Sequence, residues 1–275
     1  MNRLAIKIAG LTDPGKSRSN NEDAVWIDPQ ANLLIVADGM GGHQAGEVAS
    51  GLAIKTIPDH LQQLVHKGTA GEVADERLSG ETNRLGFCFK IANQMIFEAA
   101  KRYPEDHGMG TTCTAALITG GRLSLAHVGD SRCYLIRRGE IEQLTEDHSL
   151  VMEQVRHGLL SKDDEAVKRG QNILTRSLGT SAEVKIDMQE YPLYPGDCLL
   201  LCSDGLEKEL TDDQILEIVM KTSGPEDCAR NLIEAANAAG GRDNITVAVA
   251  QIEKASLSES ILSFMKTSFG WKAPS

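Results

Sequence analysis

The sequence predicts an α+β fold in which helices pack against antiparallel β-sheet. Short turns such as Gly120-Gly121 join strand-like segments, and such turns connect antiparallel strands because parallel strands need a long crossover. Groups of strands and groups of helices follow one another without a regular β-α-β alternation. Hydrophobic residues make up 41% of the 275 residues and 26 glycines allow many turns, as in a compact globular protein.

Strands are expected where alternating or continuous apolar runs lie between turn-forming residues. Residues 4–9 alternate between apolar and polar, and the turn Pro29-Gln30-Ala31-Asn32 separates the next two runs. Three further runs in the middle of the chain are joined by tight turns. The expected strands cover residues 4–9, 24–28, 33–38, 112–119, 122–128, 133–137, 184–190, 197–202 and 245–252.

Helices are expected where apolar residues recur at helical spacing. They cover residues 46–65, 84–102, the region near 148–157, 211–220 and 225–239. Pro58 should kink or break the first helix, because proline lacks the N–H that a helix interior needs. The polar, glycine-rich segment 68–80 is expected to be a loop.

The chain is expected to hold one domain over residues 1–252 and a tail over residues 253–275. The side chains Ile261, Leu262, Met265 and Phe269 would lie on one side of a short helix in this tail. Such a helix could dock on its own domain, fray, or bind a partner.

Charge and cysteine content restrict the classes of partner. The net charge of −11 argues against general affinity for nucleic acid or anionic membranes.

The six cysteines form no C-x-x-C pair, which indicates buried free thiols in a reducing cytoplasm. No cysteine has an arginine six positions later, which excludes the phosphate loop of cysteine-dependent phosphatases. Residues 1–11 lack the features of a signal peptide and no apolar run reaches the roughly 20 residues of a membrane span, so a cytoplasmic location is expected.

Five short motifs carry aspartate at the ends of apolar runs or in tight polar turns. They are Arg18-Ser19-Asn20-Asn21-Glu22-Asp23, Asp38-Gly39-Met40-Gly41-Gly42-His43, Gly129-Asp130-Ser131-Arg132, Ser203-Asp204-Gly205 and Arg242-Asp243-Asn244. Any one alone could be an ordinary turn or cap. Their repetition beside strand ends indicates carboxylates that converge at one edge of a sheet. Burying so much like charge is costly unless a cation neutralises it, and hard divalent metals take oxygen ligands, so a metal-dependent hydrolase is predicted.

A competing motif lies near the N-terminus. The segment from Gly10 to Ser17, which includes Lys16, matches G-x-x-x-x-G-K-[ST], the phosphate-binding P-loop of nucleotide hydrolases. A P-loop requires a helix that starts at its end, so that backbone N–H groups face the phosphates. The residues that follow form helices poorly and lead directly into an expected strand, so the motif is interpreted as a turn.

The motifs, in this order and spacing, resemble the metal-dependent protein serine/threonine phosphatases of type 2C, in their bacterial form. The resemblance runs from about Ala5 to Ile252. Its most specific matches are Asp38-Gly-Met-Gly-Gly-His43, Gly129-Asp-Ser-Arg132, Leu144-Thr-Glu-Asp-His148-Ser-Leu150 and Arg242-Asp-Asn244. It implies two antiparallel sheets packed as a sandwich flanked by helices (α-β-β-α), with a flap at about residues 145–180 beside the active site.

The resemblance also implies two Mn²⁺ or Mg²⁺ ions in a core site. Asp38 would bridge the two ions, Asp204 and Asp243 would complete one of them, and the carbonyl of Gly39 would bind the other. Waters would fill most of the remaining positions.

Further ligands are implied around this core. Glu22 matches a family carboxylate that acts directly or through water, and Asp23 matches its supporting neighbour. Asp130, together with Asp204, matches a weaker third-metal site.

The implied reaction is hydrolysis of phosphoserine and phosphothreonine by a metal-activated water. Arg18 would hold the phosphate oxygens, and His43 would protonate the leaving alkoxide as a general acid. Thr111 and Thr112 are expected to pack under the site, and His148 to position the segment that follows it. One departure affects the flap, where residues 168–172 (Lys-Arg-Gly-Gln-Asn) replace a His-Pro pair often found before the Asn.

The implied partners are phosphorylated proteins, among them a cognate bacterial serine/threonine kinase and its substrates, and a monomer is expected. An alternative function is that of a catalytically weak relative that binds phosphoproteins or senses metal. Such a protein would bind a phosphopeptide without turning it over.

Overall fold

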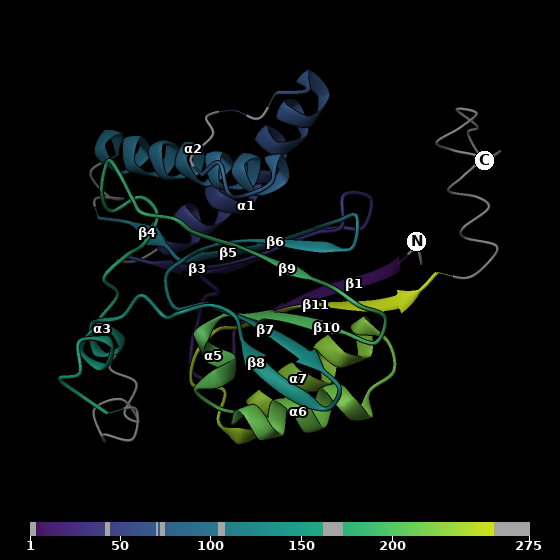
Figure 1. Ribbon diagram of the computed structural model, residues 1–275. Coiled ribbons are helices and arrows are strands. Elements are labelled where there is room, and N and C mark those ends of the chain that lie inside the picture. Colours follow the sequence, from purple (N-terminus) through teal and green to yellow (C-terminus); the bar gives the residue numbers. More distant parts are fainter. Residues whose placement is uncertain are drawn as a thin grey trace, which may run out of the picture.

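Two antiparallel sheets lie face to face in the computed structural model, and helices cover both outer faces (Figure 1). The structure describes residues 4–41, 45–69, 71, 75–103, 108–161 and 173–255. The strands are β1 Leu4–Asp13, β2 Asp23–Asp28, β3 Leu33–Met40, β4 Gly110–Thr111, β5 Cys113–Thr119, β6 Arg122–Val128, β7 Arg132–Arg137, β8 Glu140–Gln143, β9 Asp187–Pro192, β10 Cys198–Cys202 and β11 Ile245–Lys254. The helices are α1 Ala45–Lys67, α2 Gly80–Arg102, α3 Leu150–Arg156, α5 Asp204–Glu207, α6 Asp212–Lys221 and α7 Pro225–Ala239.

One sheet has the strand order β1-β11-β10-β7-β8, and the other has the order β2-β3-β5-β6-β9 with β4 paired to β3. Every paired strand is antiparallel. The predicted α+β sandwich is confirmed. Each strand can therefore pack apolar side chains on both faces, since one face meets the other sheet and the opposite face meets helices.

Three apolar clusters fill the three interfaces between these layers. The first joins α1 and α2 to their sheet through residues such as Ile57 and Phe89. The second joins α6 and α7 to the other sheet, with Leu232 and Leu200 among its members. The third lies between the two sheets and includes Val36. The core rests on aliphatic side chains, as the low aromatic content of 4% requires.

The structure extends or corrects several predicted elements. β1 continues to Asp13 instead of ending at residue 9, because β11 supplies a pairing partner along the whole strand. Pro58 lies inside α1 without ending it, since Ile57 and Leu61 are buried on either side and hold the helix on the sheet. The last strand reaches Lys254, and β9 covers residues 187–192 where 184–190 was expected.

Within the described part of the chain, three short elements were not predicted, namely β4, β8 and α5. β8 is polar and short, and its signal is the turn before it, where Arg138 and Gly139 both have positive φ as in a type I′ hairpin. The predicted tail helix lies in residues 256–275, outside the described residues. Within the described ranges no helix is both long and apolar enough to cross a membrane.

Candidate active site

The aspartates of the five sequence motifs lie at the end of the sandwich where β3 ends and β11 begins. Asp38 near the end of β3 is paired with Asp23 at the start of β2. Asp204 follows β10, and Asp243 precedes β11, the antiparallel neighbour of β10. Asp130 lies in the turn between β6 and β7, which belong to different sheets. The topology therefore brings side chains from both sheets to one end of the molecule.

Hydrogen bonds with Thr111 and Thr112 fix the backbone of Asp38. The Asp38 N–H donates to Thr112 Oγ1 at 2.9 Å, and the Asp38 carbonyl accepts from the Thr111 hydroxyl at 2.9 Å. Thr112 Oγ1 in turn lies 2.7 Å from Ser131 Oγ. Both threonines are buried and pack against the backbone of Asp38, which agrees with the expectation that they pack under the site.

A second set of contacts joins the two sheets at Asp23. The Ser203 hydroxyl donates to Asp23 Oδ2 at 2.7 Å and accepts from the Thr246 N–H at 3.0 Å. Ser203 precedes Asp204, and Thr246 lies at the start of β11. Asp23 is thereby positioned against the segments that carry Asp204 and Asp243.

Gly39 permits a close approach of three backbone segments. A Cβ atom at this position would lie 2.1 Å from the Gly46 carbonyl oxygen and 2.6 Å from the Glu22 carbonyl oxygen. The Gly39 N–H donates to that same Glu22 oxygen at 3.1 Å. Gly46 likewise leaves room for Glu22, because a Cβ there would lie 2.7 Å from Glu22 Oε2. These glycines bring Glu22 beside the end of β3.

Burial and mutual repulsion raise the proton affinity of the clustered carboxyl groups. Burial, followed by the charges of Asp23, Asp204, Asp130 and Asp243, raises the pKa of Asp38 well above its usual value. Burial and the Asp204 charge raise the pKa of Asp23 to about 6, although the hydrogen bond from Ser203 opposes them. Burial and the charges of Asp204 and Asp147 raise the pKa of Asp130 to about 7. A positive charge placed among these groups would be strongly stabilised.

Among the described residues, two cationic side chains contact this group of aspartates. Lys208 Nζ lies against Asp204 Oδ2 and 3.2 Å from Asp243 Oδ2. Arg18 Nε lies 2.9 Å from Asp243 Oδ1, and the Arg18 side chain is 53% exposed. Burial lowers the pKa of Lys208, but contact with Asp204 and Asp243 outweighs burial and raises it overall.

Two carboxylate oxygens find no hydrogen-bond partner among the described residues. Asp23 Oδ1 and Asp204 Oδ1 are buried and accept no hydrogen bond in the described part of the chain. Buried acceptors without partners are rare in folded proteins, and here they are charged oxygens next to other carboxylates. No three acidic, histidine or cysteine side chains of the described residues already surround one common point in the manner of a metal cage. The donor set fits Mg²⁺ or Mn²⁺, since hard cations bind few carboxylates and fill their remaining positions with water.

Asn244, another residue of the five motifs, connects the segments that surround the aspartates. The Glu22 N–H donates to Asn244 Oδ1 at 2.9 Å, and Asn244 Nδ2 donates to the carbonyls of Pro14 and Asn20 at 3.0 Å and 2.9 Å. Asn244 therefore holds the Arg18 segment beside Asp243. His43 lies outside the described residues, so its role as a general acid stays a prediction.

His148 positions the turn that carries Asp130. The Gly129 N–H donates to His148 Nδ1 at 3.0 Å, and His148 Nε2 lies 3.2 Å from Asp187 Oδ2. The first part of the predicted flap contains α3, and an isolated bridge links Ser149 to Leu174 beyond it. The unusual segment 168–172 lies outside the described residues.

The P-loop interpretation is excluded by the structure. The motif ends in a turn after β1, and the next regular element is the strand β2. The Lys16 N–H donates to the Gly241 carbonyl at 2.7 Å, which ties this turn to the Asp243 segment. Gly15 adopts a φ of +76°, and a Cβ there would lie 2.1 Å from the Asp243 carbonyl oxygen. Gly15 of the motif therefore allows this turn to pack closely against the Asp243 segment.

Sequence reasoning missed Lys208, Ser203 and Asn244. Lys208 lies four residues after Asp204 within one helical turn, so an i,i+4 pair would have been visible had α5 been predicted. Ser203 and Asn244 were noted within motifs but given no role. Their contacts span more than 40 positions in the sequence, and no local pattern encodes such partners.

Solved structures of bacterial serine/threonine phosphatases share this fold. The structure of PstP/Ppp from Mycobacterium tuberculosis aligns with 90% of this chain and 99% of its own, at 39% identity and a TM-score of 0.77. The catalytic domain of PstP in complex with two manganese ions aligns with 91% of this chain and 100% of its own, at 37% identity and a TM-score of 0.77.

The chain belongs to the protein phosphatase 2C family, whose pattern matches residues 15–237. The serine/threonine phosphatase stp of Listeria innocua is 40% identical over 240 residues, which cover 86% of this chain and 92% of that protein. PstP of Mycobacterium tuberculosis is 39% identical over 250 residues, which cover 90% of this chain and 45% of that longer protein.

Proposed function

We propose that this protein is a metal-dependent phosphatase that hydrolyses phosphoserine and phosphothreonine in proteins. The observation that carries the proposal is the group of buried and partly buried aspartates at one end of the family fold, where Asp23 Oδ1 and Asp204 Oδ1 have no hydrogen-bond partner among the described residues. Relatives that match nearly the whole domain carry the names of serine/threonine phosphatases.

Two Mn²⁺ or Mg²⁺ ions are proposed for the core of the site. Asp38, Asp204, Asp243 and the Gly39 carbonyl would hold them. Glu22 would bind metal directly or through water, with Asp23 as its supporting neighbour, and Asp130 would contribute to a third, weaker site together with Asp204. When bound, the ions supply positive charge that lowers the pKa of water and neutralises phosphoryl oxygens.

The other side chains of the site would orient the phosphate and protonate the leaving group. Arg18 is exposed and anchored on Asp243, so its remaining guanidinium N–H groups can bind phosphate oxygens that approach this end of the sandwich. Lys208 holds Asp204 and Asp243 in place and adds a positive charge near the reacting phosphate. His43 would give a proton to the leaving serine or threonine oxygen.

The proposed natural substrates are phosphoproteins, including an autophosphorylated serine/threonine kinase. A cytoplasmic location is proposed as well. All six cysteines are free and buried, as suits a protein that folds under reducing conditions.

The test is phosphate release from a phosphothreonine peptide with Mn²⁺ or EDTA. The wild type should turn over only with metal, and Asp204→Asn should lose nearly all turnover while remaining folded. Asp227→Asn is the matched control, because Asp227 pairs with Arg230 at 2.6 Å on the exposed surface of α7. Binding of the phosphopeptide without turnover by the metal-loaded wild type would refute the enzyme and favour a phosphoprotein-binding relative.

A further inference from the structure

A large open groove lies at the end of the sandwich opposite to the aspartates. Its volume is about 1400 Å³. Leu33 at the start of β3 lines it, whereas Asp38 near the end of β3 belongs to the candidate active site. A strand rises by about 3.3 Å per residue, so the two sites are separated by roughly 17 Å. None of the described residues assigned to the active site lines the groove.

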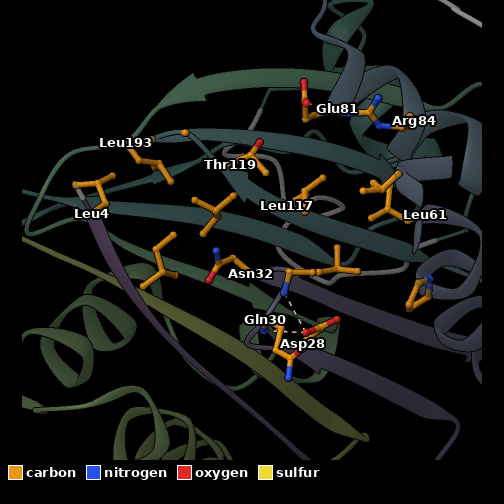
Figure 2. Close-up of a pocket in the computed structure, with 18 of the residues that line it drawn as sticks. Leu4, Asp28, Gln30, Asn32, Leu61, Glu81, Arg84, Leu117, Thr119 and Leu193 are labelled. Carbon is orange, nitrogen blue, oxygen red and sulfur yellow. Dashed lines mark hydrogen bonds and ion pairs between the residues drawn. The ribbon is translucent and has the colours of Figure 1, made fainter. Parts of the chain in front are cut away.

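The groove has an apolar floor between two polar rims (Figure 2). Leu61 of α1, Leu117 of β5 and Leu193 after β9 form much of the floor. Asp28 and Gln30 lie on one side in Figure 2, and Glu81 and Arg84 lie on another.

Three large apolar side chains of the lining are notably exposed. Trp26 is 39% exposed, Tyr194 is 54% exposed and Val65 is 57% exposed. All three line the same groove, and exposed apolar side chains that gather at one place are typical of an interaction site.

The dimensions favour a peptide segment over a small molecule. Small-molecule pockets measure about 300–1000 Å³ and contain a few converging polar groups. Here the Glu81 carboxylate is engaged by Arg84 at 2.8 Å. Asp28 Oδ1 accepts the backbone N–H groups of Gln30 and Ala31 at 2.8 Å and 3.1 Å. The groove therefore offers extended apolar area with polar edges, which suits an amphipathic segment.

We propose that this groove binds residues 256–275 of the same chain. Ala255, the residue directly before this segment, lines the groove. Lys254 pairs with Leu4, which also lines it, so β1 and β11 bring the start of the segment to the groove rim. Twenty residues would span about 30 Å as a helix, which is enough to cross the groove.

The composition of the segment complements the lining. Its large apolar residues are Leu257, Ile261, Leu262, Phe264, Met265, Phe269 and Trp271. It contains two lysines and one glutamate, whereas the lining contains Asp28, Asp59 and Glu81 against Arg84.

Covalent linkage gives the segment an effective concentration of about 1 mM, so even an intrinsic Kd of ~0.1 mM would keep the groove occupied about ten to one. The inference is independent of the enzymatic activity.

The chain has two tryptophans, Trp26 in the groove and Trp271 in the segment, which allows a direct test. In a Trp26→Phe background, Trp271 is the sole tryptophan reporter for acrylamide quenching. Docking predicts that Val65→Arg in the groove and Met265→Asp in the segment each raise the quenching constant several-fold. The matched controls Met220→Arg, an exposed position on α6, and Ser263→Asp should leave it unchanged.

Two outcomes would overturn the proposal. One is a quenching constant for Trp271 that equals that of a free peptide of residues 256–275. The other is protection that disappears on dilution together with a dimer, because a second copy would then occupy the groove. Met265→Asp alters no described contact, so loss of protection in this variant cannot be attributed to unfolding of the groove. Circular dichroism verifies that Val65→Arg is folded.

Discussion

Removing one carboxylate from the active site should stabilise the protein in the absence of divalent metal. Asp130 is 3% exposed, and burial with the charges of Asp204 and Asp147 raises its pKa from 3.8 to about 7. Each tenfold change in proton affinity corresponds to about 1.36 kcal/mol. Above pH 7 the charged Asp130 therefore destabilises the folded state by about 4 kcal/mol, or about half of that if water and Lys208 relax around it.

The sign of the pH dependence follows from the raised pKa. Below about pH 4, Asp130 is protonated in both the folded and the unfolded state, so Asp130→Asn changes little. Between pH 4 and pH 7 the unfolded state releases the proton first, and wild-type stability falls as the pH rises. The gain from Asp130→Asn should thus increase over this interval and reach about 2–4 kcal/mol at pH 8.

Urea unfolding in EDTA at pH 5 and pH 8 measures this effect. Glu142→Gln removes one negative charge from the exposed strand β8 and controls for the net charge of −11. A gain for Asp130→Asn that is equal at both pH values, or no larger than that of Glu142→Gln, would refute the account of mutual repulsion.

Three other substitutions test the surroundings of the site. Arg132→Met should lower the free energy of unfolding by about 3–5 kcal/mol in urea, because Asp147 is buried and Arg132 Nη2 contacts it at 2.7 Å; a loss under 1 kcal/mol would contradict this. Gly39→Ala should lower the melting temperature and weaken Mn²⁺ binding measured by calorimetry, since its Cβ would lie 2.1 Å from the Gly46 oxygen; an unchanged melting temperature would show that the backbone yields at no cost. Lys16→Ala should leave phosphate release and Mn²⁺ affinity nearly unchanged, and nucleotide binding that depends on Lys16 would revive the P-loop interpretation.

The sequence predicted those elements whose pattern is set locally. The alternating and apolar runs located most of the strands, because each buried strand must show its faces in its own residues. β8 escaped notice since its residues are polar and it pairs with β7 alone. The continuation of α1 through Pro58 depends on the burial of Ile57 and Leu61 against the sheet, which is a tertiary effect.

Short sequence motifs predicted the aspartates of the candidate site but not the residues that position them. Aspartates at strand ends are visible in the sequence, and antiparallel pairing of β10 with β11 brings two of them to one edge. Partners such as Ser203 for Asp23 were not foreseeable, since the pair is 180 positions apart. The contact of Lys208 with Asp243 joins α5 to a loop 35 positions away and depends on how α5 packs on β11.

The backbone at Asp38 explains how the fold tolerates so much buried negative charge. Thr111, Thr112 and the β2 register fix the main chain of Asp38 through neutral hydrogen bonds, which do not depend on the state of its carboxylate. The main chain of Asp38 therefore keeps its position even when repulsion from Asp23 and Asp204 opposes ionisation of the side chain. The backbone of Asp38 is thus preorganised for a cation, whereas Asp23, which accepts a hydrogen bond from Ser203 on its carboxylate, is more sensitive to a change in protonation.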